Sequence, residues 1–230
     1  MKLIFANKNY SSWSLRAWLV LKHFNIPFDE DMVLLSGEGW RETIRKKSPS
    51  GKVPVLVDGD VVVPETIAII EYLNDKYPAK GIWPSNRVER ALARAAAAEM
   101  HGGFTALRNE APMNLRASHP GKVDPDLVAG DLKRIERLWG ELISRSGGPY
   151  LFGSFTAADA MFAPVATRIR TYELPVTDLA MEYVEAIYAL PAFQEWLVEA
   201  VKEPWTVEQD EIDSILAARK LANSETAGRA

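Results

Sequence analysis

Residues 48–77 are SPSGKVPVLVDGDVVVPETIAIIEYLNDKY, and their pattern predicts a β-hairpin followed by a helix. Valines alternate with other side chains over residues 53–57, and a β-branched run follows at residues 61–63. Asp58-Gly59 separates the two runs, and an Asp-Gly pair favours the tight turn that joins antiparallel strands. Two paired strands are therefore expected here.

Pro54 lies at the start of the first predicted strand, where a missing N–H fits only an edge or a bend. A cis Val53-Pro54 bond is one way to make such a bend. The bend leaves the N–H and C=O of Val53 unpaired, so they are free to receive a peptide-like ligand as if it were a further strand.

A helix is expected to open at Pro64-Glu65-Thr66, because apolar residues follow at helical spacing up to Tyr77. The first N–H groups of a helix have no partner within it and carry the positive end of its dipole. The start of this helix therefore favours a carboxylate.

The Val-Pro pair, the acid-hydroxyl pair Glu65-Thr66 and the Ile-Ala-Ile-x-x-Tyr-Leu helix together resemble the glutathione-binding half of glutathione transferases. The resemblance covers residues 1–78 closely and the remainder loosely. It implies an α/β thioredoxin-like N-terminal domain (βαβ, then ββα) followed by an all-α domain. We expect a glutathione-binding domain at 1–79, a linker at 80–86, a helical domain with the electrophile site at 87–222 and a frayed tail at 223–230.

Composition narrows the function classes. The 230 residues are 47% apolar and 25% charged, which is ordinary for a globular protein with a sizeable core. A net charge of −4 argues against a nucleic-acid binder, which needs an excess of Lys and Arg. The chain has no cysteine, which excludes disulfides, Cys-ligated zinc and a protein thiol as nucleophile. Three widely spaced histidines form no metal-ligand pattern, so no metal is expected.

The N-terminus lacks a long apolar segment, and no apolar run approaches the length of a membrane span. We therefore expect a cytoplasmic protein with no membrane partner.

The first eighty residues also predict a βαβ unit. Residues 3–6 fit a buried strand, 15–22 a helix and 28–35 a second, parallel strand. A short basic helix is expected at 40–47, and its cations are more typical of a solvated face than of a site.

Everything beyond residue 86 has a helical pattern. A long helix is expected from Asn86 toward Leu115, with bends at Gly102-Gly103 and Pro112. Asp124-Pro125 opens a helix to about residue 145, and further helices are expected at 177–190, 192–201 and 206–221. Thr156-x-x-Asp159 predicts a capping box, a structural motif that glutathione transferases also carry.

Residues 11–16, SSWSLR, lie where the first strand leads into the first helix, a position that stabilises a thiolate. The hexapeptide resembles the Ser-Ser-Cys-Ser-Trp-Arg motif of zeta-class transferases, with Trp13 at the cysteine position. The resemblance gives Ser11 the role of activating the thiol of bound glutathione. Theta-class spacing gives that role to Ser12, and tyrosine-using classes would give it to Tyr10. Either serine can instead cap the helix.

The resemblance also implies the remaining glutathione contacts. Thr66 holds the γ-glutamyl carboxylate, Glu65 holds the ammonium group and Val53 pairs with the cysteinyl backbone. Lys52 lies beside this ligand edge, where a cation meets a carboxylate. Trp13 and Pro54 complete the expected glutathione set.

The electrophile is expected between the domains. Its predicted lining is Tyr10, Trp13, Met100, His101, Phe104 and Arg108. At helical spacing, Met100 and Phe104 are more often plain core than ligand contacts. Arg108 suits an anionic acceptor.

The leading hypothesis is a glutathione transferase that adds the activated thiol to a small electrophile or isomerises one through a transient adduct. One alternative is glutathione-dependent ether or halide cleavage, and another is a non-catalytic interaction protein of the same fold. A homodimer is expected from the resemblance and from the Ala-rich helix that begins near Asn86.

Overall fold

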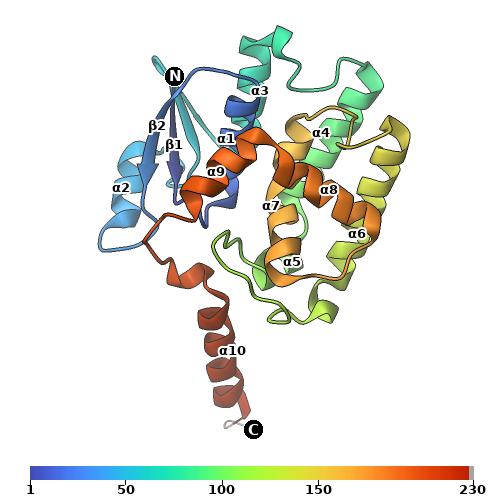
Figure 1. Cartoon of the computed structure of the whole chain (residues 1–230). Helices are drawn as coiled ribbons and strands as arrows, with labels where there is room; N and C mark the ends of the chain where they lie inside the picture. Colours follow the sequence, from blue (N-terminus) through green and yellow to red (C-terminus); the bar gives the residue numbers. More distant parts are fainter. Residues whose placement is uncertain (228–230) are drawn as a thin grey trace.

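The computed structural model describes residues 1–227. Figure 1 shows a small sheet on one side and a group of helices on the other, with α1 (Ser12–His23) and α9 (Pro191–Ala200) between them. This is the expected α/β N-terminal part followed by a helical part.

The sheet has four strands in the order β2-β1-β3-β4. Their bounds are β1 Lys2–Ala6, β2 Asp29–Val33, β3 Val55–Asp58 and β4 Val61–Pro64. β1 and β2 pair in parallel, as the βαβ pattern predicts. β3 pairs antiparallel with both β1 and β4, with Leu56 opposite Val63, so the predicted hairpin is confirmed.

Alternate residues of β1 enter two different cores. Leu3 and Phe5 pack in the main core with α1 and α3 (Thr66–Lys76). Ile4 and Ala6 pack in a smaller cluster with Ile44 of α2 (Trp40–Lys47). Because strand side chains alternate between faces, the sheet is covered on both sides, and α1 begins a few residues beyond the end of its interior strand β1.

The helical part comprises α4 to α9, with a short η1 turn before it and a last helix after it. The bounds are η1 Pro78–Lys80, α4 Arg87–Gly102, α5 Thr105–Glu110, α6 Pro125–Ser146, α7 Ala157–Tyr172, α8 Asp178–Ala189, η2 Glu208–Asp210 and α10 Ile212–Ala227.

The prediction of one bent helix from Asn86 toward Leu115 is wrong. α4 ends at Gly102, and Phe104 has a φ of 55°, which breaks the helix rather than bending it. A Cβ on Gly103 would lie 2.6 Å from the carbonyl oxygen of Glu99, so only glycine fits there. α5 then ends at Glu110, before Pro112 is reached.

The end of the chain also differs from the expectation. The last helix begins at Ile212 rather than residue 206 and continues to Ala227, so most of the expected frayed tail is helical. Residues 228–230 of that tail lie outside the described part of the chain. Figure 1 shows α10 extending away from both halves.

α7 is the buried centre of the helical part, and its start is fixed by the predicted capping box. Asp159 Oδ2 accepts from the N–H and hydroxyl of Thr156 at 2.8 and 3.0 Å. Its Oδ1 accepts from the N–H of Leu151 at 3.0 Å and the hydroxyl of Tyr183 at 3.2 Å. One carboxylate therefore joins the 151–156 turn, α7 and α8.

The segment before α10 returns to the loop that follows β1. The Glu203 carboxylate accepts hydrogen bonds from the N–H groups of Lys8 and Asn9. Glu211, the residue before α10, accepts a hydrogen bond from the Tyr10 hydroxyl. These contacts bring residues 203–211 to the start of α1.

Within residues 1–227, none of the helices combines the length and the apolar character that crossing a membrane needs. The cytoplasmic location stays a prediction.

Candidate active site

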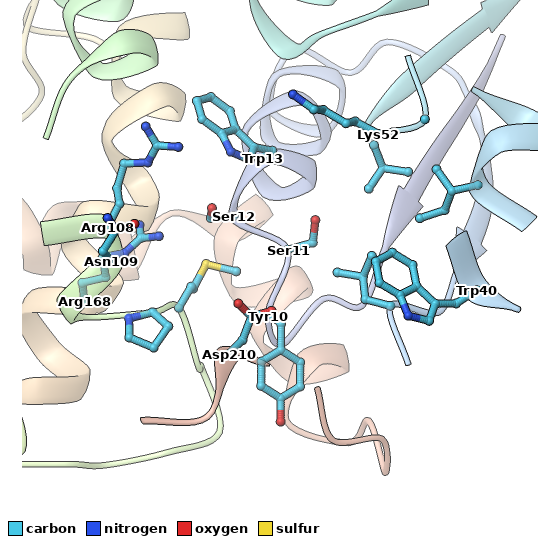
Figure 2. A pocket seen from close by; sticks show the side chains of 16 residues that line it. Tyr10, Ser11, Ser12, Trp13, Trp40, Lys52, Arg108, Asn109, Arg168 and Asp210 are labelled. Atoms are coloured by element: carbon cyan, nitrogen blue, oxygen red, sulfur yellow. The ribbon is translucent and has the colours of Figure 1, made fainter. Parts of the chain in front are cut away.

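A pocket of about 370 Å³ lies where the start of α1 faces α5, α7 and the segment before α10 (Figure 2). Tyr10, Ser11 and Ser12 come from the loop and first turn of α1. Arg108 and Arg168 come from α5 and α7. The pocket therefore lies between the two halves, as the sequence predicts for the electrophile.

Both candidate serines line this pocket, but they differ in how they are held. The Ser11 hydroxyl donates to the Ser14 hydroxyl over 2.7 Å, and Ser14 Oγ also accepts the N–H of Ala6 over 3.1 Å. Ser11 makes no side-chain cap on α1. The Ser12 hydroxyl has no hydrogen-bond partner in the described part of the chain. Ser11 is thus fixed and Ser12 is free to rotate.

Tyr10 contributes its ring rather than its hydroxyl. The hydroxyl donates to the Glu211 carboxylate and accepts from Arg116 Nη2 over 3.0 Å. Figure 2 shows it directed away from the two serines. Burial and the Glu211 carboxylate raise the pKa of Tyr10, so the phenol keeps its proton. The structure therefore favours the serines over Tyr10 as donors to a thiol.

A second pocket of about 230 Å³ adjoins the first and gathers the whole predicted glutathione set. It is lined by Trp13, Lys52, Val53, Pro54, Glu65, Thr66, His101 and Arg108. Six of these eight residues come from three separate stretches of the N-terminal half, 13, 52–54 and 65–66. The fold brings these stretches together at one end of the strands.

The backbone at this second pocket has the predicted form. Val53-Pro54 is cis, and among residues 1–227 the N–H and C=O of Val53 have no hydrogen-bond partner. Thr66 is the first residue of α3, and its hydroxyl donates to the carbonyl oxygen of Trp13 over 3.2 Å. This bond joins the starts of α1 and α3, so two helix N-termini face the same pocket.

Arg16 and Arg108 lie against Trp13, and Arg168 lies within electrostatic reach of this group. The guanidinium carbons of Arg16 and Arg108 lie 4.3 and 5.0 Å from the centre of a Trp13 ring. Arg168 donates to the carbonyl oxygens of Ala111 at 2.7 Å and Pro164 at 3.1 Å. Among the described residues, none of the three arginines forms a salt bridge with a carboxylate.

The positive charges of these three arginines repel one another. Burial, and then repulsion from Arg168 and Arg108, hold the pKa of Arg16 well below its usual value. Burial and repulsion from Arg108 lower the pKa of Arg168 to about 10. Arg16 Nη2 is buried with no hydrogen-bond partner. An anion bound beside these groups would relieve the repulsion between like charges.

One carboxyl faces this cluster across the pocket. Asp210, the last residue of η2, lines the pocket, and burial raises its pKa to about 6. Arg168 acts in the opposite direction and lowers that pKa.

Two predicted electrophile residues lie elsewhere. Met100 and Phe104 line neither pocket and are buried in the main core, where the Phe104 ring lies 6.2 Å from that of Phe162. His101 lines the smaller pocket, with its ring 5.2 Å from that of Trp13. Arg108 lines both pockets.

Sequence reasoning missed Arg168 and Asp210. Arg168 did carry a signal, because it follows Met161 and Val165 at the spacing of an apolar helix face, where a cation is unexpected. Asp210 carries no local signal and reaches the site only through the return of residues 203–211. No group of three possible metal ligands occurs among residues 1–227, and the absence of a metal stays a prediction.

The chain was compared with known protein families. Residues 10–76 match the profile described as glutathione S-transferase, N-terminal domain. Residues 125–198 match the profile described as glutathione S-transferase, C-terminal domain.

Named relatives agree with the profiles. Glutathione S-transferase Z2 of Arabidopsis thaliana is 30% identical over 214 residues, which cover 86% of this chain and 93% of that protein. A probable maleylacetoacetate isomerase of Caenorhabditis elegans is 28% identical over 189 residues, covering 79% and 86%. A glutathione transferase homologue from Burkholderia, solved with bound glutathione, has a TM-score of 0.67 at 25% identity, covering 88% of this chain and 98% of that one.

Proposed function

This chain belongs to the glutathione S-transferase family and performs glutathione-dependent transfer or isomerisation, and we propose that its acceptor is a small electrophile that carries an anionic group. The observation behind the finer proposal is the cluster of Arg16, Arg108 and Arg168, which has no carboxylate partner within residues 1–227.

Glutathione is proposed to occupy the smaller pocket and to extend into the larger one. The unpaired backbone of Val53 suits pairing with the cysteinyl unit in the manner of an added strand. The start of α3 at Thr66 suits the γ-glutamyl carboxylate, and Glu65 suits its ammonium group. Lys52 provides a cation at the other side of the same pocket. With the peptide fixed in this way, the thiol points toward Ser11 and Ser12.

We propose Ser11 as the group that stabilises the thiolate. Ser14 Oγ carries a hydrogen of its own, so rotation of the paired hydroxyls lets Ser14 donate to Ser11 and frees the Ser11 hydrogen for sulfur. A donor already held in position stabilises a developing charge without reorganisation at the moment of reaction. Ser12 has no such support.

The arginines are proposed to hold and polarise the acceptor. When a thiolate adds to an unsaturated acid, negative charge moves from sulfur toward the acceptor's carbonyl or carboxylate oxygens. Arg108 and Arg168 line the pocket where that charge appears. Arg168 is buried, and a buried cation stabilises such a charge more strongly than one in water.

The test compares maleate, a dianionic acceptor, with its neutral dimethyl ester in the wild type and in Arg108→Gln. Arg108 is half-buried and makes only a long 3.4 Å bond to a carbonyl, so its removal should leave the fold intact. We expect kcat/KM for maleate to fall about tenfold to a hundredfold, because a charge-assisted hydrogen bond contributes about 1.5 to 3 kcal/mol. The ester should be nearly unaffected.

Arg170→Gln is the control, since Arg170 lies exposed on α7, lines neither pocket and pairs with Glu185. An equal loss for maleate and its ester in Arg108→Gln would contradict an anion-binding role. All variants should be retained on immobilised glutathione. Failure of the wild type to bind millimolar glutathione would contradict the whole proposal and favour a non-catalytic interaction protein. The alternative activity, glutathione-dependent halide or ether cleavage, would instead release a halide ion or an alcohol from a substrate that carries such a group.

We also propose a homodimer. The exposed side of α4 carries Ala91, Ala95 and Ala98 at helical spacing, and such small side chains allow close approach of a second helix. Sedimentation at micromolar concentration should give twice the 25.6 kDa mass of one chain, and Ala95→Arg should shift the population toward the monomer. A wild-type mass near 25.6 kDa would contradict the dimer.

A further inference from the structure

Hydrogen bonds of its own backbone and of the neighbouring Glu211 position Asp210 in the larger pocket. Its N–H donates to the carbonyl of Val207 over 2.8 Å. The next residue, Glu211, accepts from Tyr10 and also from Asn114 Nδ2 over 3.1 Å. Figure 2 shows the Asp210 carboxyl on the same side of the pocket as Tyr10, below the two serines. The carboxyl itself has no hydrogen-bond partner in the described part of the chain. The backbone therefore positions Asp210 while its side-chain oxygens make no hydrogen bond.

An addition reaction needs a proton at this place. The thiolate forms a carbon–sulfur bond at one carbon of the acceptor's double bond, and the π electron pair moves to the neighbouring carbon and its carboxylate. Protonation of that neighbouring carbon completes the adduct. Without it, the carbanion rotates about the former double bond and expels the thiolate, which gives the geometric isomer with no net transfer of a proton.

We propose that Asp210 is the general acid that protonates this carbanion, so that it sets the ratio between addition and isomerisation. The inference rests on the proposed function of the site. The proton leaves the Asp210 carboxyl for the acceptor carbon, and the carboxylate regains a proton from solvent, which has already received the one lost by the thiol. Atoms and charge therefore balance over one turnover.

The Tyr10, Ser11 and Tyr172 hydroxyls in or near the pocket are each engaged in other hydrogen bonds. Of the described residues that line it, Asp210 alone carries a carboxyl group. The Tyr10 hydroxyl donates to Glu211, and the Ser11 hydroxyl is paired with Ser14 and directed to the thiol. Tyr172, on α7, donates to the carbonyl oxygen of Pro112 over 2.9 Å.

The charges that face Asp210 make a protonated carboxyl available. Its pKa is raised to about 6, mainly by burial; Arg168 of α7 opposes this rise and the neighbouring Glu211 adds to it. Arg108 of α5 and the phenol of Tyr10 line the same pocket, and Tyr172 lies within the electrostatic reach of Asp210. An anionic acceptor on Arg168 cancels much of the field that ionises Asp210. Binding of the substrate therefore favours the acid form when a proton is needed.

The test uses maleate with the wild type, Asp210→Asn and Asp210→Glu. Nuclear magnetic resonance separates the two products, because addition gives the dicarboxyethyl thioether of glutathione and isomerisation gives fumarate. In Asp210→Asn we expect the addition rate to fall about a hundredfold, as for loss of a general acid, while fumarate formation changes little. Asp210→Glu should restore part of the addition. Wild-type addition should decline as the pH rises past about 6, a limb that Asp210→Asn lacks.

Asp213→Asn is the matched control, because Asp213 pairs with Lys122 and lines neither pocket. The thiolate absorbance of bound glutathione should be the same in all variants, which separates proton transfer from thiol activation. Equal losses of addition and isomerisation in Asp210→Asn, or unchanged addition, would overturn the assignment. A wild type that forms neither the thiolate nor either product would overturn the proposed function and this assignment with it.

Discussion

Replacing Ser11 by alanine is expected to remove the low-pKa thiolate of bound glutathione and to lower turnover at pH 6.5 by about tenfold to a thousandfold. This is the range for losing one preorganised donor to an anionic reacting centre. The Ser11 oxygen is held by Ser14, which is held in turn by the backbone of β1, so its hydrogen can be presented to sulfur at a fixed position. Alanine leaves that position empty.

The measurement is the ultraviolet absorbance of the glutathione thiolate in the bound state as a function of pH. Ser12→Ala is the matched control, because Ser12 lines the same pocket one residue away but has no partner that fixes its hydroxyl. Ser12→Ala should weaken glutathione binding by no more than about 0.5 to 1.5 kcal/mol, the net contribution of one hydroxyl hydrogen bond. The thiolate should persist.

Two outcomes would contradict the choice of Ser11. If Ser12→Ala abolishes the thiolate and Ser11→Ala retains it, the two roles are exchanged. If neither substitution matters, the thiolate is stabilised by a backbone N–H at the start of α1, since the Tyr10 hydroxyl is occupied by Glu211 and Arg116.

The second large effect concerns stability. Asp159→Ala is expected to lower the free energy of unfolding by about 3 to 5 kcal/mol, because it leaves the N–H groups of Leu151 and Thr156 buried without acceptors. The Thr156 and Tyr183 hydroxyls also lose their acceptor. Urea unfolding followed by circular dichroism measures the change.

An ordinary helix cap is the control for this substitution. The Thr177 side chain accepts only the N–H of Ala180 at the start of α8, so Thr177→Ala should cost about 1 kcal/mol. Asp159→Asn should also be strongly destabilising, because its amide NH₂ group must face one of the donors. A loss for Asp159→Ala no larger than that for Thr177→Ala would show that the carboxylate is merely a local cap.

The local elements could be predicted because short stretches of sequence contain the residues that form their turns and helix caps. An Asp-Gly pair between β-branched runs makes the β3–β4 hairpin, and Thr156-x-x-Asp159 makes the start of α7. Val53-Pro54 makes a bend with an unpaired backbone beside it. The lining of the smaller pocket could be anticipated because most of its residues lie at such local features, while their contacts with glutathione stay a proposal.

The prediction of a continuous helix through Gly102-Gly103 is wrong because of a contact that local spacing does not show. Helical periodicity continues past the glycines, but at Gly103 the chain approaches the Glu99 carbonyl so closely that no side chain fits, and Phe104 then turns inward against Phe162 of α7. Met100 and Phe104 were expected at the electrophile site although their helical spacing is more typical of plain core, and the core interpretation holds: both are buried, and the Phe104 ring lies near Phe162 of α7.

The sequence by itself determined the sheet with its hairpin, the helical second half, the bend at Val53-Pro54 and the serines at the start of α1, because residues within a short stretch are enough to specify each. Only the tertiary structure decided that Arg108 and Arg168 line one pocket with the buried Arg16 close behind them, that the Tyr10 hydroxyl donates to Glu211, and that Asp210 lines the same pocket as the serines. These groups lie up to two hundred residues apart, for example Tyr10 and Glu211 at a separation of 201. Their charges and pKa values depend on burial and on neighbours that only the folded chain brings together.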